Sequence, residues 1–307
     1  MALHQPTGRS RLGFALAATT MLLWGTLPLA LKLTLQELDA VTITWFRFGV
    51  ASLVLVVWLA WRRQLPALGS LGRSSFGLLA VAVLGLAANF LAFLVGLDLT
   101  TPANAQILIQ LAPMLLGLGG ILVFGERYER LQWLGLGVLL AGLGVFFSGQ
   151  LRAVTEGAER YLLGSGIMVV AAVTWAGYGL AQKQLLRALP SQPLMLLIYA
   201  GCFLCFSPSS KPGSLREIGA LGLGALLYCS LNTLVAYGAF AAALNHWQAS
   251  RVSAVLALTP LATLGFSVLA EALSPGLFHA ETISWTSLAG ASTVVAGSLL
   301  VTLGARR

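Results

Sequence analysis

Residues 13–32 read GFALAATTMLLWGTLPLALK, and residues 164–183 read GSGIMVVAAVTWAGYGLAQK. Each stretch is long and apolar enough to cross the hydrocarbon core of a bilayer as a helix, which takes roughly 20 residues. The glycine, tryptophan and lysine of the first stretch, at Gly13, Trp24 and Lys32, recur in the second at a constant offset of 151 residues. The sequence therefore predicts a membrane helix that is present in two copies.

Similar apolar runs fill the rest of the chain. They predict ten transmembrane helices, at 12–33, 41–61, 75–97, 103–123, 131–149, 162–186, 193–207, 218–244, 251–270 and 283–303. The seventh run is short and is bracketed by Pro193 and Pro208. A re-entrant segment is the alternative there, because a full crossing needs about 17 residues or more.

The composition excludes a soluble protein. Hydrophobic residues make up 58% of the chain and charged residues 9%, whereas a soluble domain carries roughly 25% charge. The net charge is +8, but the basic residues lie in short gaps between apolar runs, and no basic stretch interleaved with aromatic residues suggests nucleic-acid binding. Lipid is the expected environment, and we expect no nucleic-acid partner.

The positive charges predict the orientation. With ten spans and a cytoplasmic N-terminus, twelve Lys and Arg residues fall on the cytoplasmic side and five outside, as the positive-inside rule requires. The run after Arg9 and Arg11 could be a signal peptide, but its internal copy identifies it as a first span that is retained. We therefore expect a multi-pass protein of a bacterial-type inner (plasma) membrane with both termini in the cytoplasm.

Other repeated features divide the chain into two halves. Leu111-Ala112-Pro113 matches Leu258-Thr259-Pro260 at an offset of 147. Glycines at 135, 142 and 149 in the fifth span resemble those at 290, 297 and 304 in the tenth, and a spacing of seven puts each set on one helix face. Five spans per half is an odd number, so the second half is inverted in the membrane, as in many transporters. The predicted fold is all-α, with five-helix repeats at 1–150 and 151–307.

These motifs resemble the EamA-type ten-helix branch of the drug/metabolite transporter superfamily over nearly the whole chain. The resemblance rests on Trp-Gly-Thr at 24–26, on the interval from Pro113 to Gly125-Glu126, and on a shorter second copy from Pro260 to Ala270-Glu271 that lacks the glycine. Within the branch the chain is most similar to YddG-type aromatic amino-acid exporters. The resemblance implies export of small metabolites through a central cavity lined by the inner helices of both halves.

No ionisable relay is evident in the spans. All ten acidic residues and the three histidines lie at span edges or in loops. A buried carboxylate in the membrane usually marks a proton or ion path, so a facilitator driven by the substrate gradient is favoured. Coupling through an edge group such as Glu126 or Glu271 is the alternative.

The spans do contain aromatic and uncharged polar side chains at mid-depth. Tryptophans prefer the membrane interface, so a pair well inside equivalent spans is consistent with a cavity wall. Amides are costly in lipid unless they are paired, so they should face the bundle interior, where they either bond neighbouring helices or line the cavity. The substrate-binding candidates are Trp24, Asn89, Phe90, Gln106, Gln110, Trp175, Tyr178, Asn232, Tyr237 and Ser253.

Charged and proline residues supply further candidates. Lys32 and Lys183 end equivalent helices, where they either snorkel to the headgroups or attract an anion at the cavity mouths. Arg47 lies near the start of its span and is interpreted as a topology or packing residue. Pro113 and Pro260 interrupt helical hydrogen bonding at equivalent places, and each forms either a static kink or a hinge.

The sequence predicts a transporter that exports small metabolites, amino acids with aromatic or bulky apolar side chains above all, by alternating access. Efflux of organic cations is the alternative, because aromatic faces also attract cations. A further alternative is a membrane protein that does not transport, such as a sensor or a scramblase. No hydrolase or protease motif is present, so no enzyme, catalytic residue, metal or cofactor is expected. The Cys202-x-x-Cys205 pair is interpreted as small apolar helix residues. We expect a monomer.

Overall fold

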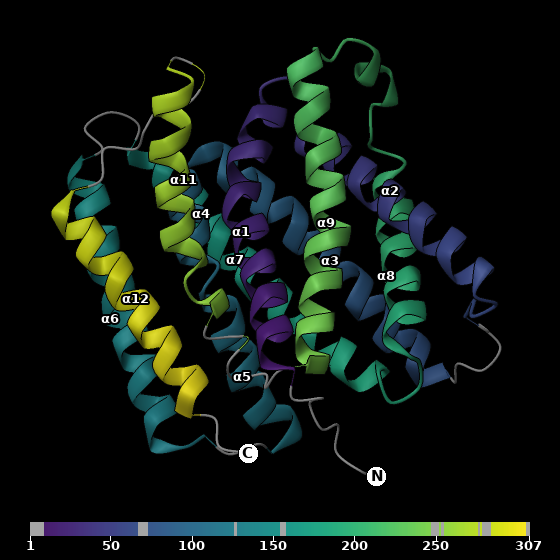
Figure 1. The fold of residues 1–307 in the computed structure, drawn as a ribbon, viewed down its shortest axis with the longest axis horizontal. Helices are drawn as coiled ribbons and strands as arrows, with labels where there is room; N and C mark the ends of the chain where they lie inside the picture. The colour runs from purple at the N-terminus through teal and green to yellow at the C-terminus, as the bar shows by residue number, and fades with distance from the viewer. Residues whose placement is uncertain are drawn as a thin grey trace.

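The computed structural model describes residues 9–66, 73–125, 128–153, 158–246, 252, 255–275, 277 and 284–304. Within these ranges the chain forms α-helices, one 3-10 helix and no strand (Figure 1). The helices are α1 (Ser10–Leu35), α2 (Ala40–Trp61), α3 (Arg73–Leu99), α4 (Pro102–Leu108), α5 (Leu111–Phe124), α6 (Arg130–Ala153), α7 (Ala158–Leu185), α8 (Ser191–Phe206), η2 (Pro212–Arg216), α9 (Ala220–His246), α11 (Thr259–Leu273) and α12 (Trp285–Gly304).

Local capping explains several helix ends. The Asp39 carboxylate accepts a 3.0 Å hydrogen bond from the Thr42 amide at the start of α2, and the Thr101 hydroxyl accepts one of 3.3 Å from the Asn104 amide at the start of α4. Both satisfy amides that a helix N-terminus leaves free. Gly125 ends α5 in the left-handed region at φ 66°, a conformation that glycine adopts without strain.

The helices have the length and polarity of membrane spans. Seven regions of the described chain are long and apolar enough to cross a bilayer, one of them formed by α4 and α5 together, and α8, α11 and α12 are shorter apolar helices. Large apolar side chains point outward, as Leu122 and Trp285 show with exposed fractions of 85% and 86%. A surface of this kind is suited to lipid. The chain is an all-α, multi-pass membrane protein, as predicted.

Helix α8 is not a re-entrant loop. It begins near the end of the bundle where α7 finishes, and the chain then continues through η2 to the opposite end, where α9 begins (Figure 1). Its 16 residues rise about 24 Å, short of the usual membrane thickness. The described segment 207–219 completes the crossing. Because every span changes sides, α1 begins and α12 ends at the same end of the bundle.

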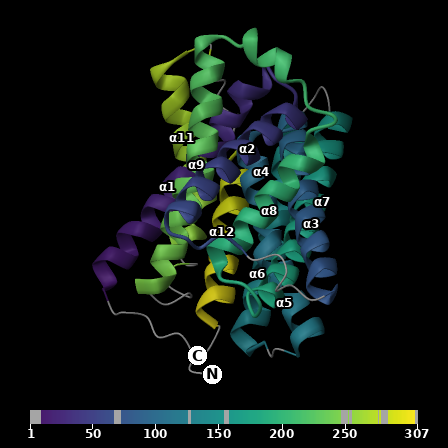
Figure 2. The ribbon, with the colours of Figure 1, turned by 90° about the vertical axis from the view of Figure 1, so that its right-hand side faces the viewer.

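The two halves pack around a pseudo-two-fold axis. Helix α6 packs on α12, α2 on α8, α1 on α9 and α3 on α7, and the last two pairs lie on opposite flanks in Figure 2. One hydrogen bond appears in both halves with donor and acceptor exchanged. The Asn89 amide donates to the Ala171 carbonyl at 2.8 Å, and the Thr20 hydroxyl donates to the Ala236 carbonyl at 3.3 Å. The offsets of 147 and 151 relate these partners. The division at residue 150 stays a prediction, since α6 continues to Ala153.

The two glycine rows face each other within one chain. A Cβ added to Gly142 would lie 2.6 Å from the Val294 nitrogen, and one added to Gly290 would lie 2.3 Å from the Phe146 nitrogen. The other members of the rows, Gly135, Gly149, Gly297 and Gly304, meet the partner helix in the same way. The rows therefore let the backbones of α6 and α12 approach closely, which is how small residues hold membrane helices together.

The fourth and ninth spans, which contain the equivalent prolines Pro113 and Pro260, are interrupted, whereas the sequence predicted each as one run. The fourth span breaks into α4 and α5 at residues 109–110, and the ninth has a turn at 257–258 before α11. Pro113 has no N–H for the carbonyl of Ile109, which instead accepts from the Ala112 amide at 2.9 Å. Pro260 likewise follows its turn, two residues after position 258. Broken helices at equivalent places commonly flank the substrate site of inverted-repeat transporters.

Candidate functional site

Arg47 is buried in the interior of the bundle. It lies seven residues after Ala40, a rise of about 10 Å along α2, which places it within the hydrocarbon depth. Its exposed fraction is 3%, and it is the one buried charged side chain among those that the structure describes. Since a cation at this depth is costly, its position marks a functional-site candidate.

The partners of Arg47 are neutral. Its Nε and Nη2 donate to the Thr233 hydroxyl of α9 at 3.3 and 3.0 Å, and its guanidinium lies 4.9 Å from the centre of the Phe90 ring. The nearest groups that interact with it electrostatically are Cys229, Tyr237 and Tyr199. Among the described residues, none of these neighbours of Arg47 carries a carboxylate.

Four rings, here called the aromatic quartet, gather near Arg47: Phe90, which the guanidinium contacts, Tyr199 and Tyr237, which interact with it electrostatically, and Phe48, which packs on Phe90 and Tyr199. The Phe48 ring lies 4.6 Å from Phe90 and 5.6 Å from Tyr199, between centres. At the offset of 151 Phe48 matches Tyr199, and at 147 Phe90 matches Tyr237. Each half thus contributes two rings, phenyl in the first and phenol in the second, and the quartet lies where the halves meet.

The predicted tryptophan pair adjoins the quartet. Trp24 packs edge-on against Tyr237 with 5.3 Å between ring centres. Trp175 lies 6.4 Å from Tyr178 in the same manner, and its side chain lies near that of Tyr237. The structure therefore brings together Trp24, Phe90, Trp175, Tyr178 and Tyr237 from the predicted site.

Most of the predicted amide side chains donate hydrogen bonds to backbone carbonyls of neighbouring helices. Gln106 donates to the Trp24 carbonyl at 2.8 Å and Asn232 to the Leu23 carbonyl at 2.6 Å. The Thr263 hydroxyl donates to the next carbonyl, Gly25, at 2.8 Å. Helices α4, α9 and α11 thus meet three consecutive carbonyls of α1 just before Pro28, where the missing proline N–H leaves the helical ladder incomplete.

The remaining predicted residues lie elsewhere. Asn89 bonds α7, as described above, and Gln110 immediately precedes α5 at the helix break, half-buried and without a side-chain capping hydrogen bond. Ser253 lies outside the described residues, as does Glu126, and the side chain of Lys183 is not described. Pro113 is exposed and Pro260 is buried.

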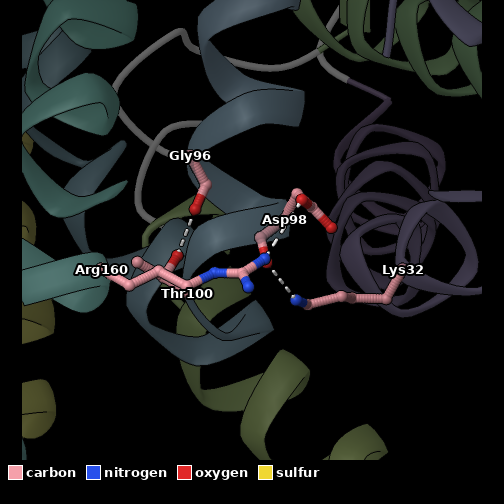
Figure 3. A network of polar contacts seen from close by, with 5 residues as sticks. All are labelled: Lys32, Gly96, Asp98, Thr100 and Arg160. Atoms are coloured by element: carbon pink, nitrogen blue, oxygen red, sulfur yellow. Dashed lines mark hydrogen bonds and ion pairs between the residues drawn. The ribbon is translucent and has the colours of Figure 1, made fainter. Parts of the chain in front are cut away.

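Lys32 lies at one end of the bundle and not beside the quartet. Figure 3 shows its ammonium pointing to the Asp98 carbonyl, at 3.0 Å. The Asp98 carboxylate pairs with Arg160 at 3.5 Å, with both side chains about half exposed. The ends of α1 and α3 and the start of α7 are therefore tied together by exposed polar contacts, which contribute little to stability.

Sequence reasoning missed four residues of the site. Arg47 was interpreted as a topology or packing residue, and Phe48, Tyr199 and Thr233 were not singled out. The depth of Arg47 in its span was visible in the sequence. The face of α2 on which it lies was not, because α2 is apolar all round and lacks a polar stripe.

Two hollows in the described surface lie away from the quartet. One is lined by apolar and small residues of α4, α6 and α7, including Leu108, Leu143 and Ser165, and another by α3, α5 and α7. Both are open grooves on the side of the bundle. Arg47, Phe48, Phe90 and Tyr199 are buried, and Tyr237 is partly exposed.

Comparisons with known proteins agree with this architecture. The model of the EamA-like transporter family matches residues 11–148 and again 162–303. An "Uncharacterized transporter" of Haemophilus influenzae is 40% identical over 95% of both chains. The "Uncharacterized inner membrane transporter YhbE" of Escherichia coli K12 is 38% identical over 96% of this chain and 92% of its own.

Two more distant proteins share the full length. A "Probable amino-acid metabolite efflux pump" of Salmonella typhimurium is 24% identical over 95% of both chains. A solved crystal structure with 21% identity superposes with a TM-score of 0.62 over 97% of this chain and 98% of its own. That likeness concerns the fold. With both family matches and the ten-span architecture in place, the chain belongs to the EamA-like transporter family and is a membrane transporter of that type.

Proposed function

We propose that this transporter exports small organic metabolites, in particular amino acids with aromatic or bulky apolar side chains, by alternating access through a central cavity. One observation carries the proposal. Rings from both halves gather between the two repeats at mid-depth, beside helices that are broken at equivalent places. Such rings suit flat or bulky apolar side chains. The efflux pump of Salmonella typhimurium supports the amino-acid class by its name.

We propose a gradient-driven facilitator and not a proton-coupled pump. No carboxylate is buried among the described residues, so a proton relay of Asp or Glu has no candidate there. The chain is proposed to act as a monomer and not as an enzyme. The glycine rows are occupied within one chain, so they offer no free face to a second copy.

The proposed location is a bacterial inner membrane with both termini cytoplasmic. The name of the Escherichia coli relative supports location in an inner membrane. The excess of basic residues on one side supports the cytoplasmic position of both termini. The proposed halves are 1–150 and 151–307. Proposed partners are a small-molecule substrate and the lipid bilayer, with no nucleic acid and no cofactor.

Efflux of organic cations is less well supported than export of amino acids. The aromatic faces could bind a cation, but the Phe90 face already contacts the guanidinium of Arg47. A second cation would enter a region that holds a buried positive charge.

Flux through purified protein in sealed liposomes tests the proposal. The vesicles are loaded with a mixture of amino acids, and their release is followed without an ion gradient. We expect aromatic and bulky apolar amino acids to leave selectively, and only from vesicles that contain the protein. Release that needs an imposed proton gradient would contradict the facilitator. If no amino acid leaves under either condition, the amino-acid proposal is wrong, and organic cations are tested next.

A further inference from the structure

The positive charge at the centre of this transporter has no counter-ion among its described neighbours. A buried cation loses its hydration, and proteins normally compensate with a carboxylate. The groups nearest to Arg47 are instead a hydroxyl, a thiol, two phenols and a phenyl ring. A leucine or methionine here would avoid this cost, so the packing of α2 alone does not account for an arginine.

The hydrogen bonds of Arg47 hold it in place without using up its donors. Thr233 donates its own hydroxyl proton to the Cys229 carbonyl at 2.9 Å. Its oxygen can therefore only accept from Arg47, which it does from both Nε and Nη2. A guanidinium has five N–H donors, and two are used here within the described residues. Three remain, and a carboxylate accepts two of them side by side.

The charge is present in only one half. At the offset of 151 that relates α1 to α7 and Phe48 to Tyr199, Arg47 corresponds to Ile198, a buried apolar residue. The aromatic rings of the site have aromatic counterparts in the other half, whereas Arg47 has no charged counterpart there. A molecule bound between the halves would therefore meet aromatic walls from both repeats and a single positive group on α2, which fixes one orientation.

We infer that Arg47 binds the carboxylate of the transported molecule, so that the substrates are small organic carboxylates, amino-acid zwitterions among them. The inference rests on the proposed function, since it assigns a substrate group to the same site. The aromatic quartet would then contact the apolar part of the substrate. Thr233 is a positioning residue that holds the guanidinium for this contact.

Matched pairs of ligands test the inference directly. Each pair is a carboxylate and its primary amide, which have the same shape and differ in charge, built on phenyl, indolyl and branched alkyl chains. Binding to purified protein is measured by the shift of the thermal unfolding midpoint, read from intrinsic tryptophan fluorescence. Wild type should be stabilised by carboxylates and not by the amides.

Variants of Arg47 separate binding from folding. Arg47→Met should lower carboxylate affinity by about tenfold or more, as expected for loss of a charge-assisted hydrogen-bonded contact. Arg47→Lys should retain part of the carboxylate affinity. Arg62→Met is the matched control, since Arg62 lies on the same helix over the Trp58 ring at 4.6 Å but is exposed. If Arg47→Met does not fold, Arg47→Lys and Thr233→Val serve, and both should weaken carboxylate binding selectively.

The outcomes distinguish this inference from the proposed function. Any one of three results would overturn the role of Arg47. These are equal stabilisation by carboxylates and amides, no stabilisation by any carboxylate, and unchanged carboxylate affinity in all folded Arg47 and Thr233 variants. Liposome flux with the same preparations addresses transport. Amino-acid release at equal rates from wild type, Arg47→Lys and Arg47→Met would keep the transport proposal and reject the inference. Carboxylate binding that needs Arg47, without any release, would keep the inference and reject transport.

Discussion

The side-chain amide of Gln106 donates a 2.8 Å hydrogen bond to the carbonyl oxygen of Trp24, the group that Pro28 deprives of its helical partner. In an unbroken helix that carbonyl would accept from the amide of residue 28, which proline lacks. A buried carbonyl without a partner is costly in a membrane protein. Gln106 of α4 therefore completes the backbone of α1, and the two helices are joined at this point.

The first prediction follows from this pair. Gln106→Leu should lower the free energy of unfolding by about 1 kcal/mol, a typical size for interhelical hydrogen bonds in membranes. In a Pro28→Ala background the restored N–H can serve the Trp24 carbonyl, so the same substitution should cost less. Thermal or denaturant unfolding of the four proteins in one detergent measures the difference.

A matched control is Gln110→Leu, four residues further on at the break between α4 and α5, which should be indifferent to Pro28. If Gln106→Leu costs the same in both backgrounds, the amide does not substitute for the missing N–H, and its effect comes from packing alone.

A second prediction concerns the close approach of α6 and α12. Gly142→Ala would place a methyl group 2.6 Å from the Val294 nitrogen, and overpacking of this kind costs about 1–3 kcal/mol. Gly137→Ala is the control on the same helix, because no atom lies within 4 Å of its added methyl. We expect a lower unfolding midpoint for the first variant and an unchanged or slightly higher one for the second.

This pair of variants also tests where the glycine rows act. Size-exclusion chromatography with mass determination should give the same monomeric mass for wild type and both variants. A change of mass in Gly142→Ala alone would place the glycine contact between copies of the chain.

The sequence was sufficient for the architecture because repetition is visible without coordinates. The copies of Trp24 and Lys32 at Trp175 and Lys183, and the glycine rows, set the number of spans and their inversion. The proline positions indicated interrupted hydrogen bonding, but not that each span would divide into separate pieces. That depends on whether neighbouring side chains, such as Gln106, can satisfy the freed backbone groups.

The site was only partly predictable. Trp24 and Trp175 were found because tryptophan at mid-depth is unusual, whereas Phe48 and Tyr199 gave no such signal, and Tyr199 lay in the weakest span. Arg47 was assigned to topology or packing because it lies near the start of its span. Which way it points is decided by how α2 packs on α8 and α9, and nothing in the local sequence of α2 records that packing.

The third prediction treats the prolines as hinges. Pro113→Ala and Pro260→Ala restore an N–H at the broken spans, so they should make these segments more continuous and slow the exchange between inward and outward states. We expect transport to fall while membrane insertion and yield stay normal. Liposome flux and the amount of folded protein measure the two effects.

Pro102→Ala is the control for this experiment. Pro102 is at the start of α4, where proline suits the helix and no hydrogen bond is lost, so its replacement should leave flux unchanged. Normal transport by both Pro113→Ala and Pro260→Ala would show that the breaks are static kinks.

The fourth prediction separates the tryptophans of the site from those at the lipid surface. Trp24 packs on Tyr237 and Trp175 packs on Tyr178 near Tyr237, from opposite halves, so either can contribute a wall to the same binding region. Trp24→Leu and Trp175→Leu should each lower the release of aromatic amino acids more than that of leucine, by roughly two- to tenfold in the ratio of the two rates. Stacking on one ring contributes about 0.5–1.5 kcal/mol, which corresponds to a factor of this order.

Trp285→Leu, whose side chain is 86% exposed toward lipid, should leave the ratio unchanged. Because the readout is a ratio of two substrates in one preparation, a general loss of folded protein cancels. A fall in both rates with a constant ratio would mean that these tryptophans support the bundle and do not contact the substrate.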